Sequence, residues 1–383
     1  MNEKRILASL SFEADWERQT LSGLIAFARE HDLHWEIRAI ARSTDLNDFI
    51  KRFQPHGLLY HPNMQLPDRL PPELKTVYFD QPGGTGRPLL QIDDQQIGEL
   101  AADHLLVQGF TRFCFAGNLN RYYAEQRLQG FRRRLRRAGQ TAAEFNTAGC
   151  FLGLLNNRED PELFHQFTQT IAKLEKPLAL FAVDDYEAYT AFELCLKAGW
   201  KIPDEIGILG VNNEELVCHA CDPMLSSIRI PYRQIGYTAA GILHRQFQGK
   251  PVPKTPQLFP AIEIVERRST ATDQVSDAAV AKSLRYIQTN LAENISINML
   301  TKLTGISRSM LERRFKESIN RTPYFEIQHQ RIERAKILLR DTESPISDIV
   351  PACGFNSATR FCQAFKEKTT LTPSQYRQFC RMH

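Results

Sequence analysis

The stretch Ile297–Lys316, INMLTKLTGISRSMLERRFK, has the pattern of two short helices joined by a tight turn. Apolar residues recur at helical spacing from Ile297 to Leu303 and predict one apolar helix face. Gly305 follows, where a helix can end in the left-handed backbone conformation that glycine adopts without steric cost. Ser307 is placed to cap the second helix. The stretch therefore predicts a helix-turn-helix, a motif whose second helix fits the major groove of DNA.

The same pattern returns further along the chain, in ISDIVPACGFNSATRFCQAFKEKTTLTP at positions 346–373. Gly305 and Gly354 hold the same place in the two turns, and Phe-Lys-Glu and Thr-Pro motifs follow both. Two copies that agree at these points are a much stronger signal than one helical hairpin. We expect a long helix over 324–340 between them. Pro351 departs from the pattern, because it removes a hydrogen-bond donor inside the first helix of the second copy.

Residues 277–383 resemble the DNA-binding domain of the AraC/XylS family of transcription regulators. The resemblance is carried by Ala352–Phe355, Arg360-Phe361, Phe365-Lys366, Thr372-Pro373 and Tyr376-Arg377. It implies an all-α domain with two helix-turn-helix units at the ends of a linking helix, which read successive major-groove faces of one DNA segment. The side chains that we expect to contact DNA are Arg308, Ser309, Arg313, Asn356, Ser357, Thr359, Arg360 and Gln363. Arg can bond to a guanine edge through two atoms, and Asn or Gln to an adenine edge. We expect Leu311, Phe315, Phe361 and Phe365 to lie in the core.

The charge distribution agrees with a C-terminal part that binds nucleic acid. The chain has 383 residues, enough for two or three domains, and a net charge of only +4. Residues 277–383 carry 17 Lys and Arg against 10 Asp and Glu, a net of +7, whereas the remainder carries 31 against 34, a net of −3. A basic module joined to a mildly acidic body fits phosphate binding by the basic module alone.

The first 270 residues alternate between short apolar runs and segments of helical periodicity. The runs that predict buried parallel strands are 5–12, 34–40, 57–60, 76–79, 110–116, 178–183 and 206–211, and the main helical segments are 16–29, 46–53, 95–108 and 124–138. This alternation predicts an α/β fold with parallel sheets in two lobes. Ligands bind beyond the carboxyl ends of such strands, where Phe12–Trp16, His61 and Asp80 stand.

This region, about residues 4–268, resembles the periplasmic-binding-protein-like effector domain of the LacI/GalR family. The matching stretches are Ile92-Asp93-Asp94 with Gly98, Arg127 with Gly130-Phe131, Ala182–Asp185 and Ile208–Asn213. By their position in that family, the resemblance implies that Arg127, Asp184 and Asn212 contact a sugar. Their chemistry suits this role, since a guanidinium fork and short carboxylate or amide groups can each bond to neighbouring hydroxyls.

Aromatic residues could supply an apolar face for the sugar ring, and the candidates are Trp16, Tyr60, Tyr122 and Tyr123. We expect Tyr60 to pack in the core, and core packing is an equal alternative for Trp16. The candidate ligand-binding residues are then Asp15, Trp16, Tyr123, Arg127, Asp184 and Asn212. Asp185 is an alternative helix cap, and Asp93 a structural turn residue.

We expect residues 1–270 to form the sugar-sensing domain and residues 271–383 the DNA-binding domain. The junction, 267–280, is polar as linkers are, and Asp277 is placed to cap the first helix of the DNA-binding domain. This order of modules resembles that of the bacterial regulators that respond to D-xylose. The resemblance implies a sugar-responsive transcription regulator, which we expect to be an activator, with a repressor as the alternative. The expected partners are operator DNA, a pentose with D-xylose first, a second copy in a homodimer, and RNA polymerase.

One alternative is a DNA-repair alkyltransferase, which joins an AraC-like domain to a nucleophilic cysteine, here Cys218 or Cys221. The sequence has no active-site cysteine motif of that type and no Ser-His-Asp, phosphate-loop or metal pattern, so we expect no enzyme, cofactor or metal. The basic run Arg132–Arg137 could bind nucleic acid, but a solvated helix face is favoured. Scattered cysteines and the lack of a long apolar run predict free thiols, no secretion signal and no membrane span, hence a cytoplasmic protein at the bacterial nucleoid.

Overall fold

The computed structural model describes residues 4–40, 44–62, 65–80, 86–147, 161–271, 277–319, 321–342, 344–369 and 371–382. The chain forms two compact units. The first comprises Met1–Leu106 and Phe110–Ala271, and the second comprises Val107–Gly109 and Thr272–His383. No helix of the described residues combines the length and apolar character needed to cross a membrane.

The first unit contains two six-stranded sheets. The first sheet, in the order β11-β5-β4-β3-β1-β2, consists of β1 (Lys4–Ala8), β2 (Trp35–Ala39), β3 (Gly57–Tyr60), β4 (Lys75–Phe79), β5 (Leu89–Ile92) and β11 (Gln257–Phe259). The second, in the order β12-β10-β9-β8-β6-β7, consists of β6 (Arg112–Gly117), β7 (Ala142–Asn146), β8 (Leu178–Ala182), β9 (Ile206–Val211), β10 (Ser226–Arg229) and β12 (Glu263–Val265). The paired strands are parallel except for β10 and β12. The chain passes between the sheets after β5, β10 and β11, which confirms the predicted two-lobed α/β fold.

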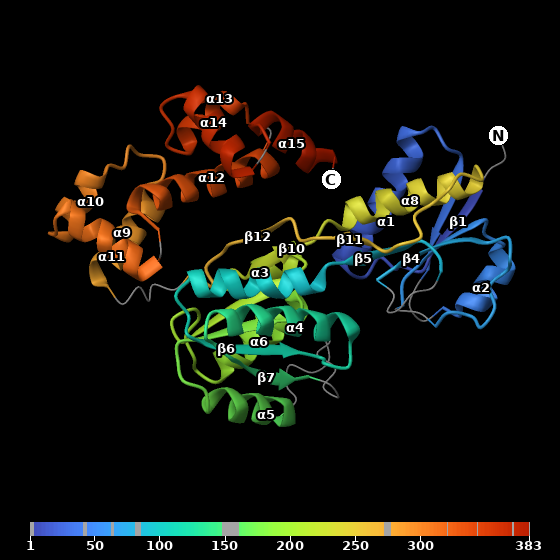
Figure 1. The fold of residues 1–383 in the computed structure, drawn as a ribbon, viewed down its shortest axis with the longest axis horizontal. Helices are drawn as coiled ribbons and strands as arrows, with labels where there is room; N and C mark the ends of the chain where they lie inside the picture. The colour runs from blue at the N-terminus through green and yellow to red at the C-terminus, as the bar shows by residue number, and fades with distance from the viewer. Residues whose placement is uncertain are drawn as a thin grey trace. The chain divides into compact units, whose positions relative to one another are not determined.

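Helices cover these sheets. They are α1 (Asp15–Glu30), α2 (Leu46–Phe53), α3 (Asp94–Val107), α4 (Tyr122–Arg137), α5 (Pro161–Ala172), α6 (Asp185–Lys197), α7 (Glu215–Ala220) and α8 (Tyr232–Phe247). Helices α1 and α8 come from opposite ends of the first unit but pack side by side (Figure 1). Every residue of β8 and β9 is buried. A strand that is covered on both faces reads as a continuous apolar run, which is why the sequence pattern located these strands.

Helices α3 and α4 cross at two glycines. A Cβ atom at Gly98 would lie 2.0 Å from the carbonyl oxygen of Arg127, and one at Gly130 would lie 2.0 Å from that of Gln95. Both distances are far below van der Waals contact, so only residues without a side chain allow the two backbones to come this close. The crossing therefore fixes the backbone of Arg127 against α3, whose first residue is Asp94.

The second unit is all-helical. Its helices are α9 (Ala278–Thr289), α10 (Ile297–Thr304), α11 (Arg308–Ile319), α12 (Pro323–Asp341), α13 (Ile346–Ala352), α14 (Ala358–Thr369) and α15 (Pro373–Met382). One apolar cluster joins α9–α11 to the start of α12, and a second joins the rest of α12 to α13–α15. Figure 1 shows the same division, with the two helix groups at opposite ends of α12. The unit thus contains two helix-turn-helix copies that share one linking helix, as predicted.

The predicted helix ends are confirmed in this unit. Gly305 ends α10 with φ +72°, and the hydroxyl of Ser307 accepts the N–H of Met310 at 3.4 Å. Asp277 accepts two N–H groups of the first turn of α9. Pro351 lies inside α13, one residue before its last. Near the end of a short helix it removes a single helical hydrogen bond, the one to the carbonyl four residues earlier, and its own carbonyl accepts the N–H of Gly354 at 2.8 Å.

We expect Gly354→Ala to destabilise the second unit far more than Gly305→Ala. Both glycines have φ near +75° (+75° and +72°), so both substitutions incur left-handed strain of about 1–2 kcal/mol. A Cβ atom at Gly354 would also lie 2.1 Å from the carbonyl oxygen of Leu291, whereas nothing lies within 4 Å at Gly305. Hydrogen exchange of the α9–α14 amides in the intact protein measures the loss of stability in each variant. Equal effects of the two substitutions would contradict the close approach at Gly354.

Candidate functional site

Arg127, on α4, is the centre of a buried polar cluster in the first unit. It is only 3% exposed. Its Nε donates to Oδ1 of Asp94 at 2.8 Å, and its Nη1 donates to the carbonyl oxygen of Val183, at the end of β8. The guanidinium carbon lies 5.2 Å from the centre of the Tyr123 ring, one helical turn earlier. A buried guanidinium requires such partners, because an unpaired charge away from water is costly.

Three carboxyl groups surround this one guanidinium. Burial and the neighbouring Asp94 raise the pKa of Asp80, which follows β4, to about 7, although Arg127 opposes the shift. Burial raises the pKa of Asp94 and of Asp184 as well, again against the effect of Arg127. Asp80 and Asp94 disfavour each other's ionisation, so the charge of Arg127 and the burial of the acids act on their pKa in opposite directions. Asp80 belongs to the first sheet and Asp184 to the second, so residues of both lobes meet at Arg127.

Aromatic rings border the cluster. The ring centre of Trp16, on α1, lies 4.8 Å from that of His61 and 5.7 Å from that of Tyr232, the first residue of α8. The hydroxyl of Tyr232 donates to Oδ1 of Asn212 at 2.7 Å. Trp16 is partly buried and packs against the main core, but it remains next to the polar cluster. Packing against the core is therefore observed for Trp16, and its contact with a sugar stays a prediction.

Two of the other aromatic candidates and Asp15 lie elsewhere. Tyr60 is 4% exposed and packs in a separate apolar cluster, which confirms its core role. Tyr122 is 40% exposed. The carboxylate of Asp15 accepts from Arg18 and Gln19 of its own helix, so it lies at the edge of the site and not around Arg127.

Asp184, a predicted ligand contact, is also the helix cap at the start of α6. The alternative that Asp185 caps a helix is wrong. The N-cap of α6 is Asp184, whose Oδ1 accepts the N–H of Glu187 at 2.8 Å. An N-cap residue needs an extended backbone, and Asp184 has it, with φ −149° and ψ 178°. Asp185 already lies in the helix and is fully buried. Asp93 accepts the N–H of Gln96 at 3.1 Å, as expected of a turn residue.

The basic run on α4 is a solvated, ion-paired helix face, as favoured by the sequence. The pairs are Arg132–Glu144, Arg133–Glu99, Arg134–Asp103 and Arg137–Glu99. All four arginines pair with acidic residues of the first unit, so these ion pairs account for the basic run without a nucleic acid.

The cysteine candidates for a nucleophile are buried. The thiol of Cys218 is 3.7 Å from Oδ2 of Asp185, and burial raises its pKa. Burial raises the pKa of Cys221 to about 12. A thiol that stays protonated is a poor nucleophile, which weighs against the alkyltransferase alternative. The six cysteines recorded in the described part of the chain are free, and no three His, Cys, Asp or Glu residues there are grouped to hold a metal.

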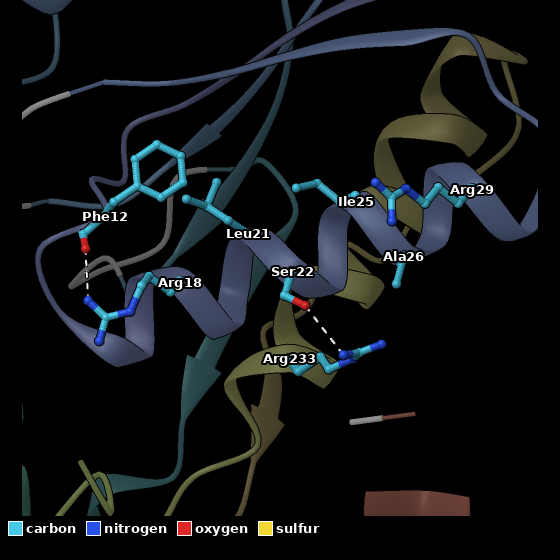
Figure 2. Close-up of a pocket in the computed structure, with 8 residues that line it drawn as sticks. All are labelled: Phe12, Arg18, Leu21, Ser22, Ile25, Ala26, Arg29 and Arg233. Carbon is cyan, nitrogen blue, oxygen red and sulfur yellow. Dashed lines mark hydrogen bonds between the residues drawn. The ribbon is translucent and has the colours of Figure 1, made fainter. Parts of the chain in front are cut away.

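A separate surface hollow lies on α1 and α8 (Figure 2). Its lining residues are Phe12, Arg18, Leu21, Ser22, Ile25, Ala26, Arg29 and Arg233. Arg18 donates to the carbonyl oxygen of Phe12 at 2.8 Å, and Arg233 donates to the hydroxyl of Ser22 at 3.3 Å. None of these residues belongs to the Arg127 cluster, so the hollow and the cluster are separate features of the first unit.

In the second unit, most of the predicted DNA-contacting side chains are exposed on or just before α11 and α14. They are Arg308, Ser309, Arg313, Asn356, Thr359, Arg360 and Gln363. Ser357 is partly buried, and its hydroxyl accepts the N–H of Arg360 at 3.4 Å as a helix cap. The opposite faces hold Leu311, Phe315, Phe361 and Phe365, all 0% exposed, which confirms their core role.

The exposed arginines of α11 make only weak bonds within their helix. Arg308 pairs with Glu312 at 2.8 Å and Arg313 with Glu317 at 3.7 Å. Exposed pairs one turn apart contribute a few tenths of a kcal/mol, so DNA phosphates or bases can replace them. Arg314 instead pairs with Asp277 at 3.1 Å.

The chain matches known proteins along most of its length. Residues 102–270 match a periplasmic binding protein-like domain, and residues 300–378 match a helix-turn-helix domain. The xylose operon regulatory protein of Escherichia coli K12 is 31% identical over 290 residues, which is 74% of this chain and 72% of that protein. This chain belongs to the family of xylose operon regulatory proteins. The family's protein from Haemophilus influenzae is 29% identical over 296 residues, 76% of this chain and 75% of that protein.

One solved structure resembles the whole chain. The structure of the xylose-binding transcription activator XylR is 25% identical, covers 99% of both chains and superposes with a TM-score of 0.61. These findings confirm the predicted family and fold. The chain is an AraC-type, DNA-binding transcription regulator with a periplasmic-binding-protein-like sensor, and its relatives are transcription regulators.

Sequence reasoning missed part of the Arg127 cluster. It placed Asp80 at the ligand-binding end of the strands but left it out of the final candidates, and it did not select Asp94 or Tyr232. A signal was present for the two aspartates, because Asp80 directly follows the predicted strand 76–79 and Asp94 lies in a stretch that matches the LacI/GalR family. Tyr232 gave none, since its neighbours in the cluster are remote in the sequence.

We expect Asp80→Asn to raise the stability of the first unit more at pH 8 than at pH 5. The folded pKa of Asp80, about 7, lies above the unfolded value near 4. Its contribution to stability is therefore full below pH 4 and is lost as the pH rises through 7. Asn mimics the protonated acid and tolerates the positive φ of this position, +54°. Each kcal/mol regained raises Tm by roughly 2–4 °C.

Calorimetry of the intact wild type and Asp80→Asn at the two pH values measures the difference. Asp68→Asn, at an exposed position, controls for the loss of one charge. If the Tm difference between Asp80→Asn and the wild type were the same at pH 5 and pH 8, Asp80 would not titrate in this range.

Proposed function

We propose that this regulator senses D-xylose at the Arg127 cluster and activates the genes of pentose utilisation. Residues 1–270 act as the sensor and residues 271–383 as the DNA reader. The observation that carries the proposal is the cluster itself, where one buried guanidinium and carboxyl and amide groups of both lobes meet beside Trp16. The printed names of the relatives, xylose operon regulatory protein and xylose-binding transcription activator, support the choice of sugar.

The chemistry of the cluster favours a neutral polyol. Arg127 can donate to a ring or hydroxyl oxygen, while Asp184 and Asn212 can accept from adjacent hydroxyls. Trp16 supplies an apolar face against C–H groups of the ring. Arg127 already pairs with Asp94, so no uncompensated positive charge is left for an additional anion, and a sugar phosphate or sugar acid is disfavoured.

The sugar acts by favouring one arrangement of the lobes. Glu214, after β9, accepts the N–H of Asp15 at 3.0 Å and pairs with Arg18 at 3.3 Å, both on α1. A ligand that bonds residues of both lobes stabilises the state in which such contacts form, and only this difference in affinity can change DNA binding. The active form is a homodimer at operator DNA in the bacterial cytoplasm, where it recruits RNA polymerase.

We expect D-xylose to raise the Tm of the wild type and not that of Asp184→Ser. Ser keeps the N-cap of α6 that Asp184 provides, so the variant removes the carboxylate without removing the cap. At 100 times Kd a ligand adds about 2.7 kcal/mol of stability. A thermal-shift panel of D-xylose, L-arabinose, D-ribose, D-glucose, D-xylose 5-phosphate and D-xylonate tests this, with Asp68→Ser as control. A shift by the phosphate or acid alone would contradict the polyol site.

We expect Arg308→Ala and Arg360→Ala to weaken specific DNA binding by roughly 5- to 150-fold, because one two-atom base contact is worth about 1–3 kcal/mol. Fluorescence anisotropy with a duplex selected by the wild type from a random pool measures the affinity. Arg52→Ala removes the same charge from an exposed position of the first unit. An equally small loss of DNA affinity in all three variants would show that neither Arg308 nor Arg360 contacts a base.

A further inference from the structure

Two asparagines after β9 have an unusual backbone. Asn212 and Asn213 have φ values of +107° and +53°. Residues with side chains seldom adopt such values, and two in succession persist only where the surroundings hold them. We call Asn212–Glu214 the effector loop, because it contains the proposed sugar contact Asn212.

Buried hydrogen bonds hold this effector loop. The N–H of Asn213 donates to the hydroxyl of Ser227 at 2.9 Å, and that hydroxyl donates to Oδ1 of Asp185 at 2.6 Å. The N–H of Glu214 donates to Oδ2 of Asp185 at 2.7 Å. Asp185 and Ser227 are both 0% exposed. The buried carboxyl group of Asp185 thus anchors the strained backbone through both of its oxygens.

The side chain of Asn213 is held from another direction. Its Oδ1 accepts from Nη2 of Arg267 at 2.9 Å, and Nη1 of the same guanidinium donates to the carbonyl oxygen of Leu225 at 2.9 Å. The backbone of Arg267 bonds to the hydroxyl of Ser226 through both its N–H and its carbonyl, each at 2.9 Å. Arg267 therefore joins the effector loop to the start of β10.

Arg267 begins the last segment of the first unit, Arg267–Thr270, which we call the exit segment. The hydroxyl of Ser269 donates to the carbonyl oxygen of Ile208 at 2.6 Å. Thr270 bonds to Ser226 at 2.8 Å and to Nε2 of His104 at 2.9 Å. Ser269 and Thr270 are at most 1% exposed. The exit segment is thus part of the second lobe's sheet edge and core, and the sequence of the DNA-binding part follows it.

The effector loop also contacts the first lobe. Glu214 accepts the N–H of Asp15 at 3.0 Å and pairs with Arg18 at 3.3 Å, as described above. Three consecutive residues therefore have three different partners: Asn212 faces Tyr232 and the proposed sugar, Asn213 faces Arg267, and Glu214 faces α1. Binding of a ligand at Asn212, or a movement of the lobes that breaks the Glu214 contacts with α1, therefore acts on the same short effector loop.

We propose that Arg267 is a positioning residue that couples the effector loop to the exit segment through its bond to Asn213. Its fork holds Oδ1 of Asn213 and the carbonyl oxygen of Leu225 at once, so movement of the loop changes the bonds that place the exit segment. The hydrogen bonds to Ser227, Asp185 and Arg267 hold the backbone of the effector loop at these angles. The loss of one of these bonds can therefore change the loop conformation. The choice of D-xylose as the ligand rests on the proposed function, whereas the bond between the two segments does not.

The first experiment needs no ligand. Hydrogen exchange is measured on the full-length wild type, Arg267→Ala, Asn213→Gly and Arg268→Ala. Asn213→Gly suits the positive φ and removes the side chain that carries the acceptor, and Arg268 is an exposed arginine next in sequence to Arg267. We expect Arg267→Ala to speed exchange at amides 213–214, and Asn213→Gly to speed it at 267–270, each by about tenfold or more. Arg268→Ala should leave both segments unchanged.

A reciprocal effect distinguishes coupling from a general loss of structure. If either variant also sped exchange throughout β8 and β9, or if Arg268→Ala acted as Arg267→Ala does, the specific link would be refuted. The double variant Arg267→Ala with Asn213→Gly should show no more exchange than the larger single effect, because both remove one bond. Additive effects would also overturn the proposal.

The second experiment adds D-xylose to the same four proteins. In the wild type and Arg268→Ala, we expect the sugar to slow exchange in both the effector loop and the exit segment. In Arg267→Ala it should slow exchange in the loop alone, with a calorimetric Kd within about tenfold of the wild type. A response of the exit segment in Arg267→Ala equal to the wild type would overturn the coupling. No response anywhere in the wild type would count against the proposed sugar and leave the ligand-free result to decide the link.

Discussion

The first unit depends on the burial of one positive charge. Arg127 lies 3% exposed between two helices, and its guanidinium is tolerated because Asp94 and the carbonyl of Val183 bond to it. This position can only be reached if α3 and α4 are close enough to bring Asp94 to the guanidinium. The crossing at Gly98 and Gly130 provides this approach. Burial raises the pKa of the neighbouring acids, and the one positive charge at the centre opposes that rise.

The second unit is constrained in a different way. Its two helix-turn-helix copies share α12, and Arg331 of that helix donates to the carbonyl oxygen of Glu293 at 2.7 Å while its guanidinium lies 5.7 Å from the ring of Phe355. Glu293 precedes α10 of the first copy, and Phe355 follows the turn of the second. Together with the approach of Gly354 to Leu291, these contacts hold both copies against the linking helix. If α11 and α14 are both held to α12, they can bind two major-groove sites only at one separation along the DNA.

Much of the fold could be predicted from local pattern, and the site only in part. Helix α2 and strands β3 and β9 have the predicted bounds, because their apolar runs are buried as continuous units. Helix α4 begins at Tyr122, two residues before the predicted start, and this places Tyr123 one turn from Arg127. The meeting of Asp80 and Tyr232 with Arg127 could not be inferred, because it depends on how remote segments fold together. The sequence also could not show which of the two adjacent aspartates caps α6 and which is buried. That choice depends on the backbone angles at Asp184, and two identical neighbouring residues do not reveal them.

The positive φ angles of Asn212 and Asn213 restrict how this protein can acquire a new effector. Few side chains other than those of Asn, Asp and Gly tolerate that backbone, so most exchanges at these two positions are excluded by the main chain before any ligand is considered. Diversity in sugar preference is therefore easier to reach at Trp16, Tyr123 and Asp184, whose backbones are ordinary. A laboratory search for altered specificity gains most by varying those three positions and leaving the asparagine pair intact.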